Sequence, residues 1–157
     1  MPQTLAQLPR SLCAVVLLGI VGAGAAGAQD LSPCLRDAET ACLLAERFEV
    51  GVVWTTSEAS GEGRVMSFAG ARAESDQSAF FWFFDPANFE MGVKMVDACS
   101  FTNSYWVFVS GLTNQAYDVR ITDTHTSLFR IYRNPLGQYP QTIGATGAGD
   151  GFPCTPP

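Results

Sequence analysis

Basic residues are scarce in this sequence, and Lys94 and His125 are the only lysine and the only histidine. Nine basic residues stand against 15 acidic ones, which gives a formal net charge of −6. A chain with this balance has no basic surface to neutralise phosphate groups. We therefore expect neither nucleic acid nor an anionic membrane as a partner.

Long hydrophobic runs are missing after the N-terminal region. Arg10 precedes an apolar run at residues 12–20, and small residues follow up to Ala28. This order is typical of a signal peptide with its cleavage site, and the run is too short to span a bilayer. We predict a signal peptide at residues 1–28, no membrane span, and a mature chain that is secreted or periplasmic after cleavage near Ala28.

Closely spaced cysteine pairs of the Cys-x-x-Cys kind, which mark zinc sites, are absent. Four cysteines, Cys34, Cys42, Cys99 and Cys154, remain once Cys13 leaves with the signal peptide. An even number in an exported chain predicts two disulfides, and three pairings are open. We favour Cys42 with Cys99, joining the first strand to the end of the central strand pair, and Cys34 with Cys154, tying the termini together. In the chain-entropy model each would contribute about 4 kcal/mol.

Helical periodicity is also lacking, and short apolar or alternating segments are separated by turn residues instead. The aromatic run at 80–84 and the segment 105–109 have no polar alternation, so both are predicted to be strands buried on both faces. Five more strands are predicted at residues 47–54, 64–69, 91–96, 117–122 and 128–132. Seven strands with no helices between them predict an all-β fold, an antiparallel β-sandwich of about seven strands that is immunoglobulin-like in architecture.

Composition divides the chain into four parts. The signal peptide at 1–28 is followed by an N-terminal lead-in at 29–45 and by the β-sandwich domain at 46–137. Residues 138–157 are rich in glycine and proline and lack periodicity. We expect this C-terminal tail to be extended and poorly ordered except where Cys154 holds it.

Many spaced positions of the predicted sandwich form one pattern that runs from Cys42 to Gly137. Besides the run 81–84 at its centre, the pattern includes Cys42-Leu43, Arg47-Phe48, Asn88, Glu90, Val93-Lys94, Asp97, Cys99, Trp106-Val107-Phe108, Thr122-Asp123-Thr124 and Asn134-Pro135. The pattern resembles a module that recurs in exported bacterial proteins, often beside other extracellular domains. The resemblance implies a secreted accessory unit and carries no activity, ligand or catalytic residue. It also supports the pairing of Cys42 with Cys99.

Oxygen ligands gather in the predicted turn after the aromatic run. Asp85, Asn88 and Glu90 place three side-chain oxygens within one loop, and Asp123 is available from elsewhere in the chain. Calcium requires six or more oxygen ligands, so these residues are candidate calcium ligands. The loop lacks the spacing of a twelve-residue helical calcium loop. The alternative is that Asp85 and Asn88 form Asx-turn hydrogen bonds.

Catalytic groups are few. His125 would need a nucleophile and an orienting acid to act as a general base, and its setting predicts the tip of a hairpin. A glycosidase would need two of the carboxylates Asp85, Glu90 and Asp97 at a defined separation across a cleft. Turn capping explains the same carboxylates, and we therefore expect that the protein is not an enzyme.

The leading hypothesis is a secreted, non-catalytic accessory or binding module, braced by disulfides, whose partner is an extracellular protein or a glycan. One alternative is an extracellular protease inhibitor or carbohydrate-binding module that uses the loop 55–63 or 70–78. Another is a small hydrolase built on the acidic hairpin. If one face of the strand 80–84 is uncovered, its rings would mark a contact with protein or carbohydrate.

Overall fold

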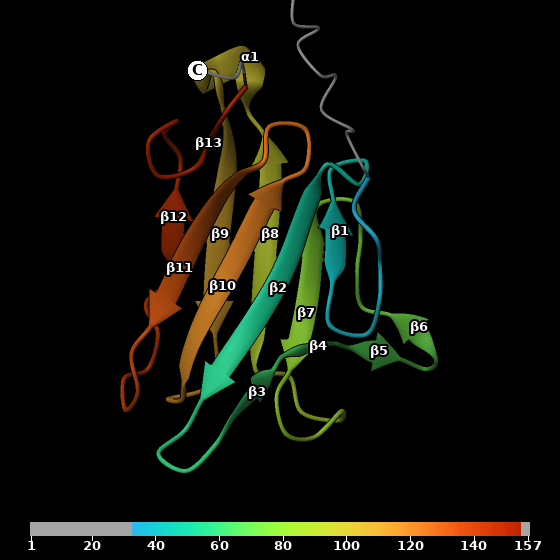
Figure 1. The fold of residues 1–157 in the computed structure, drawn as a ribbon, viewed down its shortest axis with the longest axis vertical. Helices are drawn as coiled ribbons and strands as arrows, with labels where there is room; N and C mark the ends of the chain where they lie inside the picture. Colours follow the sequence, from blue (N-terminus) through green and yellow to red (C-terminus); the bar gives the residue numbers. More distant parts are fainter. Residues whose placement is uncertain (1–32, 155–157) are drawn as a thin grey trace, which may run out of the picture.

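A computed structural model describes residues 33–154 of the chain (Figure 1). The predicted signal peptide at 1–28 and its cleavage site lie outside the described residues. Helix α1 (Cys99–Thr102) is a single turn of four residues. In the part of the chain that the structure describes, no helix is long and apolar enough to cross a membrane.

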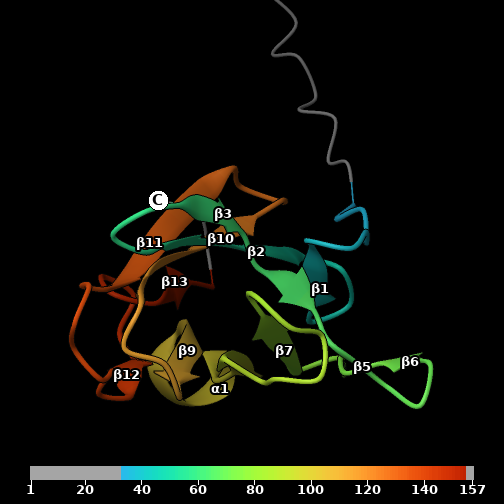
Figure 2. The same ribbon diagram turned by 90° about the horizontal axis from the view of Figure 1, so that it is seen from below.

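Two antiparallel sheets pack face to face, as the view along the strands shows (Figure 2). The sheet that we call the β2 sheet contains, in spatial order, β1 (Ala41–Leu43), β2 (Phe48–Thr55), β10 (Ala116–Asp123) and β11 (Leu128–Asn134), with β3 (Ser60–Glu62) paired to β2. The β8 sheet contains, in order, β12 (Ile143–Ala145), β9 (Ser104–Gly111), β8 (Met91–Asp97), β7 (Ser78–Trp82) and β4 (Arg64–Val65), with β13 (Phe152–Pro153) paired to β9. This arrangement confirms the predicted all-β sandwich.

Six of the seven predicted strands are present, as β2, β7, β8, β9, β10 and β11. The segment predicted at 64–69 divides into β4 and β5 (Ser67–Phe68), and β5 forms a separate hairpin with β6 (Ala71–Arg72) that projects from the sandwich (Figure 1). The predicted loops 55–63 and 70–78 thus contain β3 and β6, because such short strands carry too few residues to show a periodicity.

The core lies between the two sheets and consists of the inward-facing residues of each strand. Along β8 the side chains of Met91, Val93 and Met95 are buried and alternate with outward-facing positions, as predicted. Phe48 of β2 is fully buried and meets Phe152 of β13 edge to face, with ring centroids 5.1 Å apart. Burial of such rings is the main source of stability of a domain of this size.

Burial on both faces, which we predicted for residues 80–84 and 105–109, is wrong for the outer face of the β8 sheet. Phe80 is 38 % exposed, and Trp106 and Phe108 are only half-buried. The physical reason is that the fold has two layers. Within residues 33–154 no third layer packs on the outer side of the β8 sheet, so its aromatic residues face solvent.

Strands also extend beyond the predicted sandwich at 46–137. Strand β1 lies in the predicted lead-in at 29–45, and β12 and β13 lie in the predicted tail at 138–157. Both tail strands pair with β9. The expectation of an extended, poorly ordered tail is therefore wrong for residues up to Cys154, because buried side chains such as Ala145 and Phe152 hold the segment on the sheet.

The disulfides join Cys34 to Cys42 and Cys99 to Cys154. The predicted pairs, Cys42 with Cys99 and Cys34 with Cys154, are wrong. Strand β13 runs beside the start of β9, and the Cys154 N–H donates to the Asn103 carbonyl at 3.2 Å. This contact brings Cys154 next to α1, which contains Cys99. No sequence pattern predicts β13, so the correct pairing could not be predicted.

Candidate functional site

The loop with the candidate calcium ligands uses its polar groups internally. Asp85 Oδ1 accepts the Ala87 N–H at 2.8 Å, which is the Asx turn given as the alternative. Asn88 Nδ2 donates to Glu90 Oε1, and Glu90 is buried. The structure therefore brings Asn88 and Glu90 together, while Asp85 shapes the turn.

Asp123 does not join this loop. It lies at the end of β10 opposite Phe48, beside Tyr105 of β9, whereas the loop connects β7 to β8 at the other end of the sandwich. Within residues 33–154 no group of three or more His, Cys, Asp or Glu side chains is placed to hold a metal ion. Calcium binding stays a prediction.

The candidate catalytic residues do not converge. His125 is exposed in the turn between β10 and β11, and its backbone N–H donates to Asp123 Oδ1 at 3.0 Å. Asp97 lies at the opposite end of β8 from Glu90, and its Oδ1 accepts the Cys99 N–H at 3.0 Å. Each of these residues has a structural role in a turn, as the alternative interpretation stated.

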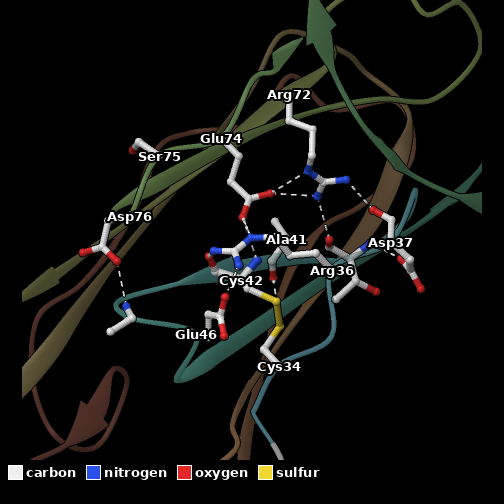
Figure 3. Close-up of polar contacts among 12 residues, drawn as sticks. Cys34, Arg36, Asp37, Ala41, Cys42, Glu46, Arg72, Glu74, Ser75 and Asp76 are labelled. Carbon is white, nitrogen blue, oxygen red and sulfur yellow. Dashed lines mark hydrogen bonds and ion pairs between the residues drawn. A yellow bond between two sulfur atoms is a disulfide. The ribbon is translucent and has the colours of Figure 1, made fainter. Parts of the chain in front are cut away.

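A cluster of charges, which sequence reasoning missed, fastens the N-terminal segment to the sandwich (Figure 3). The Glu74 carboxylate accepts hydrogen bonds from Arg36 at 2.8 Å and from Arg72 at 2.7 Å, and its side chain is only 5 % exposed. Glu74 also accepts the Cys42 N–H at 3.1 Å, and Arg36 donates to the Cys42 carbonyl. Strand β1 is an edge strand, and these bonds supply partners for the N–H and the carbonyl of Cys42 that no neighbouring strand provides.

Burial alone would raise the pKa of Glu74, but the hydrogen bonds from Arg72 and Arg36 outweigh it and hold the pKa below its ordinary value. Each oxygen of the Glu74 carboxylate accepts two hydrogen bonds within the protein, so the cluster is a structural clasp.

Removal of the Glu74 carboxylate tests this structural role. We expect Glu74→Ala to lower the free energy of unfolding by about 1–3 kcal/mol, because the Cys42 N–H is left without an acceptor. Urea denaturation measures the loss. The control is Glu39→Ala, which removes an exposed ion pair with Arg64 and should cost about 0.5 kcal/mol or less. Equal losses for the two variants would contradict the clasp.

The outer face of the β8 sheet carries an apolar groove, which we call the outer groove. Register places Phe80 beside Gly92, Gly92 beside Ser110, and Lys94 between Ser78 and Phe108. The groove has a volume of about 320 Å³ and is lined by Ser78, Phe80, Phe89, Gly92, Val93, Lys94, Phe108, Ser110, Gly111 and Leu112. This volume lies at the lower end of the range of about 300–1,000 Å³ for small-molecule sites.

Gly92 determines the shape of one wall. A Cβ at position 92 would lie 3.0 Å from Cδ1 of Phe80, so a larger residue would require the Phe80 ring to move by a few tenths of an ångström. Phe80 in turn meets Phe89 edge to face, with ring centroids 5.0 Å apart and planes at 88°. The two rings and the exposed Leu112 form a continuous apolar wall.

Lys94 and Phe108 form the other side of the outer groove. The Lys94 ammonium nitrogen lies 5.8 Å from the centroid of the Phe108 ring, within the range of a cation–π contact. Phe108 also packs near Trp106, at 6.4 Å between centroids, and the Trp106 indole N–H donates to Thr102. The rings on this face are therefore held by their neighbours.

The outer face of the β2 sheet is different. Its central strands carry charged side chains, and Arg133 pairs with Asp118 at 3.1 Å. Arg120 lies over the exposed Phe129 ring, 4.5 Å from its centroid. Aromatic character is therefore concentrated on the β8 sheet. In the sequence, this aromatic face is indicated by the lack of polar alternation in 80–84 and 105–109. The same lack of alternation led to the wrong prediction that both faces of these strands are buried.

Comparison of the chain with protein-family models, with curated proteins and with solved structures found no match. The resemblance to a secreted bacterial module stays a prediction.

Proposed function

We propose that the protein is a secreted, non-catalytic binding module whose ligand surface is the outer groove of the β8 sheet. The observation that carries the proposal is the open apolar groove lined by Phe80, Phe89 and Phe108, which have no third layer over them among residues 33–154. An apolar concavity with a few polar groups is the usual form of a small-molecule site. Two disulfides and the predicted signal peptide support an extracellular location.

The non-catalytic part of the proposal is supported by the placement of the polar residues. His125, Asp97 and Glu90 lie at separate positions; the Asp97 and Glu90 carboxylates each accept a hydrogen bond from a neighbouring residue, and His125 is exposed at the turn between β10 and β11. Hydrolysis of a polysaccharide or peptide substrate that is lost in Glu90→Ala would overturn it and favour the alternative of a hydrolase.

Phe80→Ala tests the groove. We expect ligand binding to weaken about tenfold, because the ring supplies much of the apolar wall. The measurement is an NMR titration of backbone amides with a panel of neutral oligosaccharides, aliphatic alcohols and aliphatic acids. At least one class should shift amides of β7, β8 and β9 around the outer groove.

The matched control is Phe129→Ala, which removes an exposed ring from the outer face of the opposite sheet and should leave binding unchanged. Amide shifts confined to the β2 sheet, or no shift with any compound, would rule out the outer groove as the ligand surface. Inhibition of secreted proteases by the intact domain, unchanged in Phe80→Ala, would favour the inhibitor alternative.

A further inference from the structure

Lys94 is the only ionisable residue that lines the outer groove. It is also the only lysine of a chain with a formal net charge of −6. Its ammonium nitrogen lies 5.8 Å from the centroid of the Phe108 ring, in a groove whose other lining residues are uncharged. Because the groove holds a single cation and is otherwise apolar, a ligand with one negative charge is complementary to it.

Lys94 has no charged partner among residues 33–154. Its ammonium group makes no ion pair and no hydrogen bond with any residue of 33–154, whereas carboxylates pair with Arg36, Arg47, Arg64, Arg72 and Arg133. The two carboxylates that flank Lys94 most closely in the sequence, Glu90 and Asp97, are engaged elsewhere. Asp97 accepts the Cys99 N–H, and Glu90 accepts from the Asn88 amide. The ammonium group is therefore available to an anion from solution.

The walls of the groove select for an apolar ligand body. Phe80, Phe89 and Leu112 offer no hydrogen-bonding atoms on their side chains. The groove has two side-chain hydroxyl groups, those of Ser78 and Ser110; Ser78 Oγ bonds to Ser75 Oγ at 2.9 Å, and Ser110 Oγ accepts from Thr142 at 3.3 Å. A sugar has many hydroxyl groups, and most would lose their hydrogen bonds to water here without replacement, which is unfavourable.

We propose that the outer groove binds an amphipathic organic monoanion, with its carboxylate at Lys94 and its hydrocarbon body against Phe80, Phe89 and Leu112. The inference rests on the proposed function, because it takes the groove to be the ligand surface. Carboxylate and ammonium pair by a charge-assisted hydrogen bond, and the hydrocarbon body replaces water along the apolar wall. The excess of negative charge on the chain repels ligands that carry several negative charges.

The test uses three soluble probes with the same eight-carbon body: octanoate, octanol and octylammonium. NMR titration of the intact mature protein measures their affinity and the amides that shift. We expect octanoate to bind about tenfold more tightly than octanol, since a hydrogen bond to a charged group contributes more than a neutral one. Octylammonium should bind more weakly than octanol because it is repelled by Lys94.

Substitutions of Lys94 test whether its ammonium group causes the preference for octanoate over octanol. Lys94→Met should remove the advantage of octanoate over octanol, and Lys94→Arg should keep it. The control is Arg120→Met, which removes a cation held over an exposed phenylalanine on the opposite sheet and should leave the preference intact.

The outcomes separate the two proposals. Equal binding of octanoate and octanol in the groove, or a preference for octanoate that survives Lys94→Met, would overturn the proposal of a monoanionic ligand. The groove would still stand as the ligand surface. Tighter binding of a neutral oligosaccharide than of octanoate would do the same. Binding of none of these compounds at the groove would overturn both.

Discussion

Replacing Cys99 and Cys154 together with alanine is expected to lower the free energy of unfolding by about 4 kcal/mol. This disulfide closes a loop with a sequence separation of 55 residues, and the entropy lost by the unfolded chain grows with the length of the closed loop. Typical domains have a stability of about 5–15 kcal/mol, so the loss is a large share of the total. Urea denaturation of the double variant measures it.

The matched control is the double replacement of Cys34 and Cys42. Its loop has a sequence separation of 8 residues, so the same relation gives about 2.5 kcal/mol. Peptide mapping under non-reducing conditions should also recover Cys99 linked to Cys154. A peptide that links Cys42 to Cys99, or a larger loss from the shorter loop, would falsify the pairing and the argument.

Asp123→Ala is expected to lower the free energy of unfolding by about 3–5 kcal/mol, the usual cost of leaving one partner of a buried ion pair alone. The Asp123 carboxylate accepts from Arg47 Nε at 2.9 Å and from Arg47 Nη2 at 2.7 Å, and its side chain is 1 % exposed. The Arg47 guanidinium also donates to the Tyr105 hydroxyl at 2.7 Å and lies over its ring. The pair thus joins β10 of one sheet to β9 of the other.

The matched control is Asp118→Ala on the same strand. Its partner Arg133 is exposed, and the pair should contribute about 0–1 kcal/mol. Thermal or urea unfolding of both variants gives the comparison. A loss at Asp123 no greater than that at Asp118 would show that the pair does not hold the sheets together.

The same pair predicts a dependence of stability on pH. Burial alone would raise the pKa of Asp123, but the hydrogen bonds and charge of Arg47 outweigh it and hold the pKa below its ordinary value of 3.8. The unfolded state therefore binds the proton first as the pH falls. Stability from this pair is fully present above about pH 4–5 and is lost as the pH falls through the folded pKa. In Asp123→Ala this part of the acid dependence should be absent.

The alternation of residues predicted most of the strands but not all of them. Strands β2, β8 and β10 each present several inward apolar residues in alternation, so their period is visible in the sequence. Strands β3, β12 and β13 have two or three residues, too few for a period. Their positions depend on pairing with longer strands far away in the sequence, and the disulfide of Cys154 depends on that pairing.

The candidate site was predicted in part. The aromatic composition of 80–84 and 105–109 identified the strands that carry the outer groove, and the possibility of an uncovered face was stated. The position of Phe89 and Leu112 beside Phe80 depends on two loops that meet at one end of the sheet, where the Leu112 N–H donates to the Glu90 carbonyl at 2.7 Å. No local pattern contains such a contact.

By itself the sequence determined the all-β class, the central aromatic strands, the acidic surface charge and the presence of four cysteines for two disulfides, because each follows from composition or from the two-residue period of a strand. Only the tertiary structure decided which cysteines pair, which aromatic rings face solvent, and that Lys94 lies among these rings without an ion pair to any residue of 33–154. These properties depend on contacts between residues distant along the chain, and the sequence carries no local signal of which distant residues will meet.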